Sequence, residues 1–159
     1  MVKRDIIPPI SESEWEVMRV IWSHKEITSG EVIAALAHEM EWSASTIKTL
    51  LARLVSKGLL QTRREGNRFH YSPLVSERAA WRAASSQLID SICAQKMGQK
   101  IALLIEQVPL SFADLELLQE SIDKKRASAL PVVPCDCIPD QCLCESCQEV
   151  APRTLTAMP

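Results

Sequence analysis

The chain has 159 residues, of which 47% are hydrophobic, and its formal net charge is only −2. This length supports one small globular core with an appended module, but not two large domains. Charged residues interrupt the apolar ones every few positions, so no stretch approaches the roughly 20 residues that a membrane-spanning helix needs. Residues 1–10 lack the apolar run and the small-residue cleavage site of a signal peptide. We therefore expect a small cytoplasmic protein without a membrane partner.

Helix-start signals open the first two predicted helices. Overlapping capping boxes begin at Ser11 and Ser13, after a proline pair, and start a helix that should run to about Ser23. A further box begins at Thr28 and opens a second short helix. Both segments carry apolar residues at helical spacing, which predicts that one face of each is buried.

A third helix is predicted from Ser43 to Gly58, where glycine suits a helix end. Its buried stripe is predicted to consist of Ile47, Leu50, Leu51, Leu54 and Val55. The opposite face carries hydroxyl groups and cations and includes Ser45, Thr46, Lys48, Thr49 and Arg53.

A basic hairpin follows this helix. Residues 59–64 and 68–72 read as two short strands joined by a Gly/Asn turn. Residues 44–73 hold six cations and one carboxylate, a local charge of +5, whereas residues 76–159 hold 8 basic and 11 acidic residues. The arginines of the hairpin, which would make sequence-independent phosphate contacts, are Arg63, Arg64 and Arg68.

Three helices followed by a hairpin is the order of a winged helix-turn-helix domain, here assigned to residues 1–75. In that fold the third helix enters the major groove of DNA and the hairpin, or wing, reaches the adjacent backbone. Small hydroxyl residues allow close approach to base edges, and a long donor such as Arg53 reaches guanine or phosphate. The alternative is a small helical scaffold whose polar face is only solvated.

Residues 76–126 return to helical periodicity. Pro109 interrupts this region, and Ser111 with Asp114 caps a last helix that ends on a basic run at 124–126, where cations suit the helix dipole. Helices of this kind cannot bury their apolar faces alone. Residues 127–134 read as an extended linker. The fold class is therefore mainly α, with a two-stranded wing and a cysteine-containing tail.

Five of the six cysteines lie between Cys135 and Cys147, in the segment 135–147. A disulfide framework would spread its cysteines through a secreted domain, so metal binding is the better interpretation. Pro139 and Asp140 would help the chain turn back between two C-x-C pairs so that both pairs meet. These pairs, separated by four residues, give the predicted metal ligands Cys135, Cys137, Cys142 and Cys144.

All-thiolate sites favour Cu(I), Zn(II) or iron–sulfur clusters, and the compact spacing suits Cu(I) better than a zinc ribbon. Cys147 forms a C-x-x-C overlap with Cys144 and is either a spare ligand or a free thiol. Cys93, on the apolar side of a predicted helix, is expected to be a buried core residue rather than a ligand. Residues 148–159 are expected to be a disordered tail. The alternative for the whole cluster is a set of incidental thiols.

The chain resembles the BlaI/MecI/CopY family of bacterial winged-helix repressors. The resemblance is carried by ISESEWEVM at 10–18, WSASTIKTLLARLVSKG at 42–58 and EGNRFHY at 65–71. It implies that residues 76–126 form a dimerisation domain and that a homodimer binds palindromic operator DNA containing TACA and TGTA half-sites. It also implies that the positions presented to DNA are Ser45, Thr46, Lys48, Thr49 and Arg53.

The C-x-C pairs are similar to the signature of the copper-responsive, CopY-type branch of that family. The resemblance implies that the apo or Zn(II)-loaded dimer holds the operator. It further implies that Cu(I), delivered by a copper chaperone, displaces zinc and releases the DNA, so that copper-transport genes are expressed. The penicillin-responsive relatives are switched by cleavage at an Asn-Phe bond, and this sequence has no Asn-Phe pair.

Other interpretations remain open at this point. Clustered thiols also oxidise to disulfides, which allows a redox-sensing repressor, and thiolates bind Zn(II) or Cd(II) as inducers. A metal-buffering protein that does not bind DNA would leave the basic segment 44–73 without a purpose. The three histidines lack a matching acid or nucleophile pattern, so we do not expect an enzyme.

Overall fold

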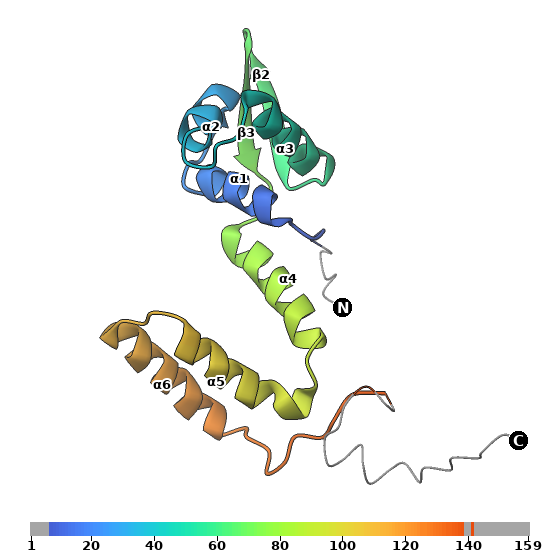
Figure 1. Ribbon diagram of the computed structural model, residues 1–159, viewed down its shortest axis with the longest axis vertical. Helices are drawn as coiled ribbons and strands as arrows, with labels where there is room; N and C mark the ends of the chain where they lie inside the picture. The colour runs from blue at the N-terminus through green and yellow to red at the C-terminus, as the bar shows by residue number, and fades with distance from the viewer. Residues whose placement is uncertain (1–6, 139–140, 142–159) are drawn as a thin grey trace, which may run out of the picture. The chain divides into compact units, whose positions relative to one another are not determined.

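The computed structural model describes residues 7–138 and 141 (Figure 1). The chain divides into two compact units, with the division between Gln87 and Leu88. The fold is mainly α and contains a winged helix-turn-helix with a small antiparallel sheet, which confirms the predicted fold class. In the part of the chain that the structure describes, no helix is long and apolar enough to cross a membrane.

The first three helices begin where the sequence places their caps. α1 spans Glu12–Trp22, α2 spans Ser29–Leu36 and α3 spans Ala44–Ser56. Ser11 and Thr28 each accept a hydrogen bond from the backbone N–H three residues on, and a glutamate there accepts one from the cap in return. Of the two overlapping boxes before α1, the one that begins at Ser11 forms the cap.

The wing is a hairpin whose strands β2, Leu60–Glu65, and β3, Arg68–Pro73, pair antiparallel. Gly66 in the turn has φ 58°, a left-handed conformation that glycine adopts without steric cost. A third strand, β1 at Ile27–Thr28, pairs with β3, so the sheet order is β1-β3-β2. The predicted two-stranded wing is thus joined to the helices through a short strand that the sequence did not indicate.

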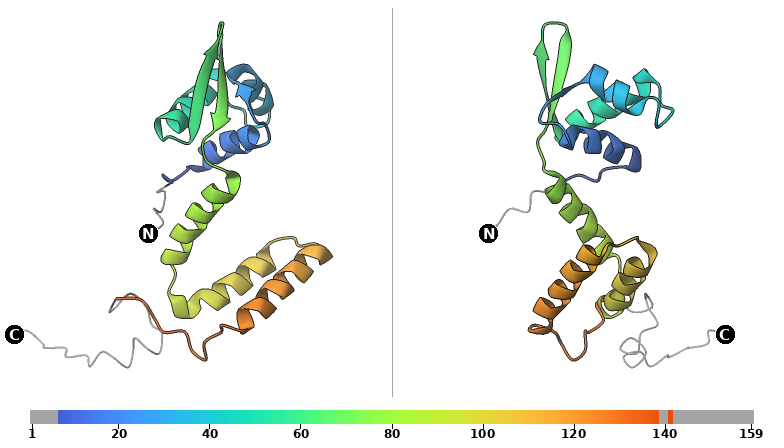
Figure 2. Two further views of the ribbon diagram at one scale, coloured as in Figure 1. Left: turned by 180° about the vertical axis from the view of Figure 1, so that it is seen from behind. Right: turned by 90° about the vertical axis from the view of Figure 1, so that its left-hand side faces the viewer.

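One hydrophobic core lies within the first unit, between the helices and the base of the sheet (Figures 1 and 2). The predicted buried stripe of α3 is confirmed for four residues, whereas Val55 is only partly buried. The buried members of this core are Val17, Met18, Ile21, Ile27, Val32, Leu36, Ile47, Leu50, Leu51, Leu54, Leu59 and Leu60. Because the opposite face of α3 takes no part in this packing, its polar side chains remain exposed at the surface.

A partly buried ion pair joins the start of α1 to the end of α3. Glu14 is 2% exposed, and its Oε2 accepts hydrogen bonds from Lys57 Nζ at 2.5 Å and from the Ser11 backbone N–H at 2.8 Å. Lys57 Nζ also donates to the Pro9 carbonyl at 2.8 Å. Burial alone would raise the pKa of Glu14, but the bonds from Lys57 and Ser11 outweigh it and hold the pKa below its ordinary value.

The first part of α4, Glu77–Asp90, packs on α1. The ring of Trp81 lies 6.0 Å from that of Trp15, which lies 5.4 Å from that of Trp22. Trp22 Nε1 donates to the Val75 carbonyl at 2.9 Å, which fixes the chain just before α4 begins. Three tryptophans therefore hold the start of α4 against the winged helix.

The second unit contains the end of α4, the short 3-10 helix η1 at Ala94–Lys96, α5 at Met97–Gln107 and α6 at Phe112–Arg126. α5 and α6 run antiparallel to each other (Figure 2). No residue of α5 or α6, both of which lie wholly within the described residues, is buried. The exposed large apolar side chains of this unit include Leu88, Ile89, Ile101, Leu103, Leu104, Val108, Phe112, Leu115, Leu117 and Ile122.

Candidate DNA interface and metal centre

The N-terminal half of α3 presents a hydroxyl-rich surface. Ser43 Oγ caps the helix by accepting from Thr46 N–H at 3.1 Å and lies 2.8 Å from Ser45 Oγ. Thr49 Oγ1 donates to the Ser45 carbonyl at 2.9 Å, which leaves its lone pairs to accept. All five predicted contact residues of this helix are exposed, namely Ser45, Thr46, Lys48, Thr49 and Arg53. Small side chains at a helix N-terminus suit the close approach of DNA, since the backbone N–H groups there favour phosphate.

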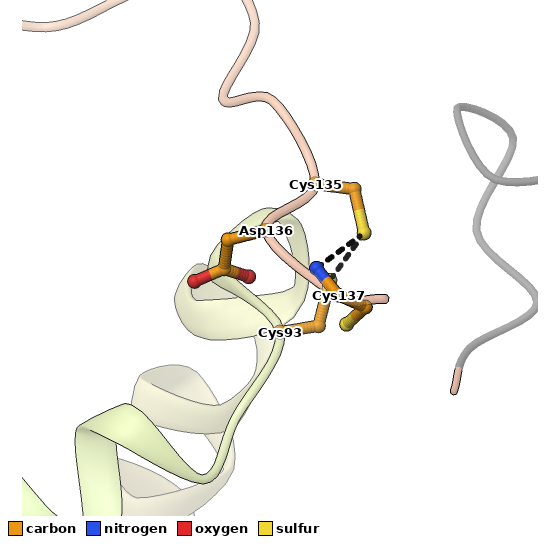
Figure 3. Close-up of side chains that lie close together, drawn as sticks. All are labelled: Cys93, Cys135, Asp136 and Cys137. Carbon is orange, nitrogen blue, oxygen red and sulfur yellow. Dashed lines mark hydrogen bonds between the residues drawn. The ribbon is translucent and has the colours of Figure 1, made fainter. Parts of the chain in front are cut away.

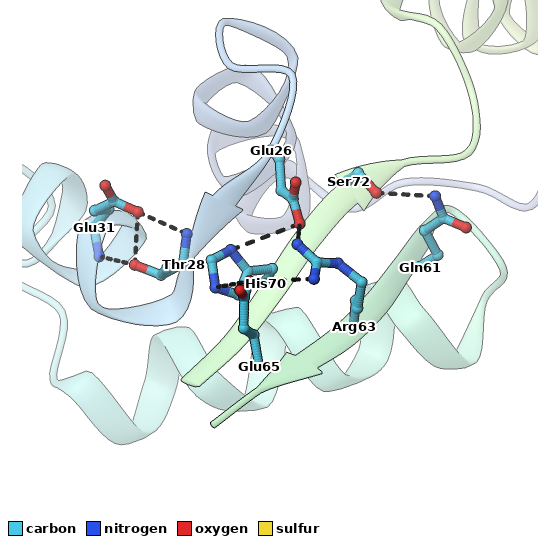
Figure 4. Close-up of polar contacts among 8 residues, drawn as sticks. All are labelled: Glu26, Thr28, Glu31, Gln61, Arg63, Glu65, His70 and Ser72. Carbon is cyan, nitrogen blue, oxygen red and sulfur yellow. Dashed lines mark hydrogen bonds and ion pairs between the residues drawn. The ribbon is translucent and has the colours of Figure 1, made fainter. Parts of the chain in front are cut away.

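The three wing arginines differ in their surroundings. Arg63 donates to Glu26 at 2.9 Å and lies 3.1 Å from Glu65, and these two carboxylates raise the pKa of Arg63 (Figure 4). Arg64 Nε donates to the Gly66 carbonyl at 3.2 Å. Among the described side chains, Arg68 forms no ion pair. The guanidinium of Arg63 is thus already paired with two carboxylates, whereas Arg64 and Arg68 form no ion pair with the described side chains.

An open groove lies between the start of α2 and the tip of the wing. Its lining includes Gly30 and Glu31 from α2, Lys48 from α3, and Asn67 and Arg68 from the wing. The contribution of the start of α2 to this surface was not predicted from the sequence. The groove thus places the carboxylate of Glu31 at the start of α2 on the same surface as the cations Lys48 and Arg68.

A second cluster gathers side chains that can ligate a metal. One ligand atom from each of Cys93, Cys135, Asp136 and Cys137 lies within 4.8 Å of all the others (Figure 3). The Sγ atoms of Cys93 and Cys135 are 3.4 Å apart. Of the predicted ligands, the structure thus places Cys135 and Cys137 together. The remaining cysteines of the motif lie outside the described residues, namely Cys142, Cys144 and Cys147.

The expectation that Cys93 is a buried core residue on a helix is wrong. α4 ends at Asp90, so Cys93 lies in the connection before η1, where it is the N-terminal flanking residue and only partly buried. Its thiol faces the cysteine segment instead of a core. No spacing rule could have indicated this contact, because 42 residues separate Cys93 from Cys135.

One hydrogen bond joins the cysteine segment to the connection between α4 and α5, and another lies within the segment. Asp136 Oδ1 accepts from the Ala94 backbone N–H at 2.8 Å. Cys135 Sγ accepts from the Cys137 backbone N–H at 3.4 Å. The predicted turn through Pro139 and Asp140 falls on residues outside those described. An open groove beside the cluster is lined by Lys96 and Lys100 and also by the carboxylates of Asp90 and Asp136, so charges of both signs surround the thiols.

The donor set fits a soft metal ion. A Zn–S distance of about 2.3 Å in a tetrahedral site implies sulfur–sulfur separations of about 3.8 Å. The 3.4 Å contact is shorter and the 4.8 Å limit of the cluster is longer than that separation, so the spacing of the donor atoms is compatible with a shared ion. Thiolates select Cu(I) and Zn(II), whereas the carboxylate of Asp136 suits Zn(II) and is a poor ligand for Cu(I).

The penicillinase repressor family model matches residues 10–124. The chain therefore belongs to the penicillinase repressor family, whose members are BlaI- and MecI-type transcriptional repressors with a DNA-binding domain. The matched residues contain the whole winged helix, including α3 and the wing, and extend through most of α6. The cysteine segment lies beyond the match.

Several known proteins are similar to this chain. An uncharacterised 16.5 kDa protein of Latilactobacillus sakei is 45% identical over 86% of this chain and 93% of its own length. The penicillinase repressor of Bacillus licheniformis is 32% identical over 76% of this chain and 94% of its own length. A solved structure of the CopR repressor is 48% identical, with a TM-score of 0.38, over 43% of this chain and all of that one.

Proposed function

We propose that the protein is a copper-responsive transcriptional repressor that acts in the cytoplasm. It binds a palindromic operator with TACA and TGTA half-sites as a homodimer and leaves the DNA when Cu(I) occupies its thiolates. The observation that carries this proposal is the gathering of Cys93, Cys135 and Cys137 in a chain of a repressor family. The controlled genes would be those of copper transport.

The exposed face of α3 supports operator recognition. Its hydroxyl groups and Arg53 lie opposite the core, and Arg64 and Arg68 extend the basic surface along the wing. Arginine bonds guanine edges and phosphates, while hydroxyl groups accept and donate at short range. Direct readout is assigned to α3 and backbone contacts to the wing.

The exposed apolar faces of α5 and α6 support homodimerisation. Leu104 and Leu115 are 50% and 47% exposed, and Phe112 is 89% exposed. Such surfaces on neighbouring helices are costly in water and would be covered by the same surface of a second copy. A two-fold dimer of winged helices matches a palindromic operator, because each domain then reads one half-site.

The donor chemistry supports Cu(I) as the inducing ion and Zn(II) as the ion of the DNA-bound state. Bound Cu(I) would supply strong bonds to two or three sulfurs, whereas Zn(II) takes four ligands. Cys135 and Cys137 would hold the ion together with Cys142 and Cys144, which complete the motif. A copper chaperone would be the donor, since partly exposed thiols can accept the ion by ligand exchange.

The 3.4 Å contact between the thiols of Cys93 and Cys135 also favours a second candidate, a redox switch. A hydroperoxide would oxidise one thiol to a sulfenic acid, and attack by the other would form the disulfide and release water. Operator binding would then respond to oxidant rather than to metal. A repressor induced by Zn(II) or Cd(II) is the corresponding alternative with another ion.

An electrophoretic mobility-shift titration separates these candidates. Reduced protein is bound to a duplex with TACA and TGTA half-sites, and Cu(I), Zn(II), Cd(II) and hydrogen peroxide are added in separate series. Release by Cu(I) at no more than a few equivalents, without release by Zn(II), is the expected result. Release by peroxide alone would favour the redox switch, release by Zn(II) or Cd(II) would reassign the inducer, and no binding in any series would refute the operator.

A further inference from the structure

We propose that Cys93 is a ligand of the metal site and attaches the cysteine segment to the connection between α4 and α5. This inference rests on the metal-sensing function proposed above and extends it. The C-x-C pairs supply ligands that are close together in the sequence. Cys93 would add one from the helical unit, so that the site joins two separate segments of the chain.

The geometry places Cys93 among the ligands rather than beside them. Its Sγ lies 3.4 Å from Cys135 Sγ, and both thiols fall within the 4.8 Å cluster that contains Cys137. An ion bound between Cys135 and Cys137 would therefore lie close to the Cys93 thiol. Cu(I) binds to thiolates, so the Cys93 thiol is of the right chemical type to be one of its ligands.

Asp136 holds the two segments together independently of the thiols. Its Oδ1 accepts from the backbone N–H of Ala94, the residue after Cys93, at 2.8 Å. This bond fixes the distance between Cys93 and the residues that flank Asp136 on either side. Asp136 is in this account a positioning residue, because its carboxylate acts through the placement of Cys93.

Because Cys93 lies between α4 and η1, metal binding at this thiol would act directly on the connection between the helices. Cys93 follows the last residue of α4, Asp90, by three positions and directly precedes η1, which continues into α5. A site confined to the segment after α6 would act on the α4–α5 connection indirectly, through the hydrogen bond between Asp136 and Ala94. A bond to Cys93 restrains that connection, and its formation or loss can alter the helices on which the proposed dimer depends.

Metal protection of individual thiols tests the inference on the full chain. The phosphine-reduced protein is alkylated with iodoacetamide, without metal and with Zn(II) or Cu(I), and the rate at each cysteine is followed by mass spectrometry. We expect metal to slow alkylation of Cys93, Cys135 and Cys137 together, by about ten-fold or more, because a thiolate bound to metal is no longer free to attack iodoacetamide. Protection of Cys135 and Cys137 without Cys93 would overturn this inference alone. Protection of no cysteine would overturn the metal-sensing function and this inference with it.

Two substitutions at Asp136 test its positioning role. Asp136→Asn keeps an oxygen that can accept from Ala94, whereas Asp136→Ala removes it. We expect metal to protect Cys93 in the asparagine variant as in the unaltered protein, and protection of Cys93 to fall several-fold in the alanine variant while Cys135 stays protected. Equal protection of Cys93 in both variants would show that the carboxylate does not place it.

Cobalt substitution counts the thiolates. Co(II) bound to the protein gives sulfur-to-metal charge-transfer absorption whose intensity increases with the number of coordinated thiolates. Cys93→Ser and Cys137→Ser should each lower that intensity by the same step, and Ser91→Ala, a neighbouring exposed position, serves as the control. Intensity that is unchanged in Cys93→Ser but reduced in Cys137→Ser would contradict ligation by Cys93.

Discussion

The two units of the chain bury their apolar residues in opposite ways. In the first, side chains such as Leu51 and Leu54 are completely buried among helices of the same unit. In the second, comparable leucines such as Leu104 are half exposed. A unit that forms its own core can fold around it, whereas helices with exposed apolar faces depend on a surface from outside. The DNA-binding fold is therefore expected to be stable by itself, and the helical unit to be stable through dimerisation.

The largest effect should come from truncating the first core. Leu54→Ala removes a fully buried side chain, and we expect it to lower the free energy of unfolding by about 3 kcal/mol at every protein concentration. The matched change Leu104→Ala should instead destabilise in a way that depends on protein concentration, because it weakens association. Urea unfolding at two concentrations separates the cases. If the free energy of unfolding fell by an amount independent of protein concentration in both variants, the second unit would not depend on association and the contrast between the units would be wrong.

Breaking the ion pair of Glu14 with Lys57 should lower the free energy of unfolding by nearly as much. Lys57→Met leaves a carboxylate buried without its cation, which costs about 3 kcal/mol. Because the folded-state pKa of Glu14 is lowered, its contribution is present above the ordinary value of 4.5 and is lost as the pH falls through the lowered pKa. The difference in unfolding free energy between Lys57→Met and the unaltered protein should shrink over that acid range. The exposed Lys25→Met is the control, and an equal loss there would contradict the account.

The next largest effect should be a loss of operator affinity caused by a substitution on α3. Arg53→Ala should weaken binding by about 2 kcal/mol and relax the preference for the operator over a mutated half-site. Fluorescence anisotropy with both duplexes measures the two quantities. A loss of equal size on both duplexes would show that Arg53 binds phosphate rather than a base.

The smallest effects should distinguish the wing arginines. Arg68→Ala should weaken binding to all sequences alike and lower the slope of log affinity against log salt by about one. Arg63→Ala should change the slope less, since Glu26 and Glu65 already neutralise Arg63. Salt titrations of the two variants make the comparison. A larger change of slope in Arg63→Ala would mean that its carboxylate partners are displaced on DNA.

The local features of the fold followed from the sequence. The caps at Ser11, Thr28 and Ser111 and the glycine at the wing turn each depend on neighbouring residues, so their spacing was enough to predict them. The short strand β1 was not predicted because its two residues are too few to show the alternation of apolar and polar side chains that indicates a strand. It exists only through its pairing with β3.

Contacts between distant residues account for what the sequence could not indicate. Cys93 meets the cysteine segment because α4 ends early and Asp136 bonds to the connection that follows. Arg63 meets Glu26 because β1 aligns beside β3, which brings residues 37 positions apart within 2.9 Å. Cys93 was expected in a core but lies beside the Cys135 thiol. Arg63 was expected to contact phosphate but is paired with Glu26.

The most direct test of the central claim is operator binding measured by anisotropy with and without Cu(I), for the unaltered protein and for Cys135→Ser with Cys137→Ser. The account predicts that Cu(I) at a few equivalents weakens operator binding by the unaltered protein by about ten-fold or more, a coupling within the usual range between two sites. The double variant should keep its affinity when Cu(I) is added. An unaltered protein that ignores Cu(I), or a double variant that responds equally, would contradict the claim that these thiolates control DNA binding.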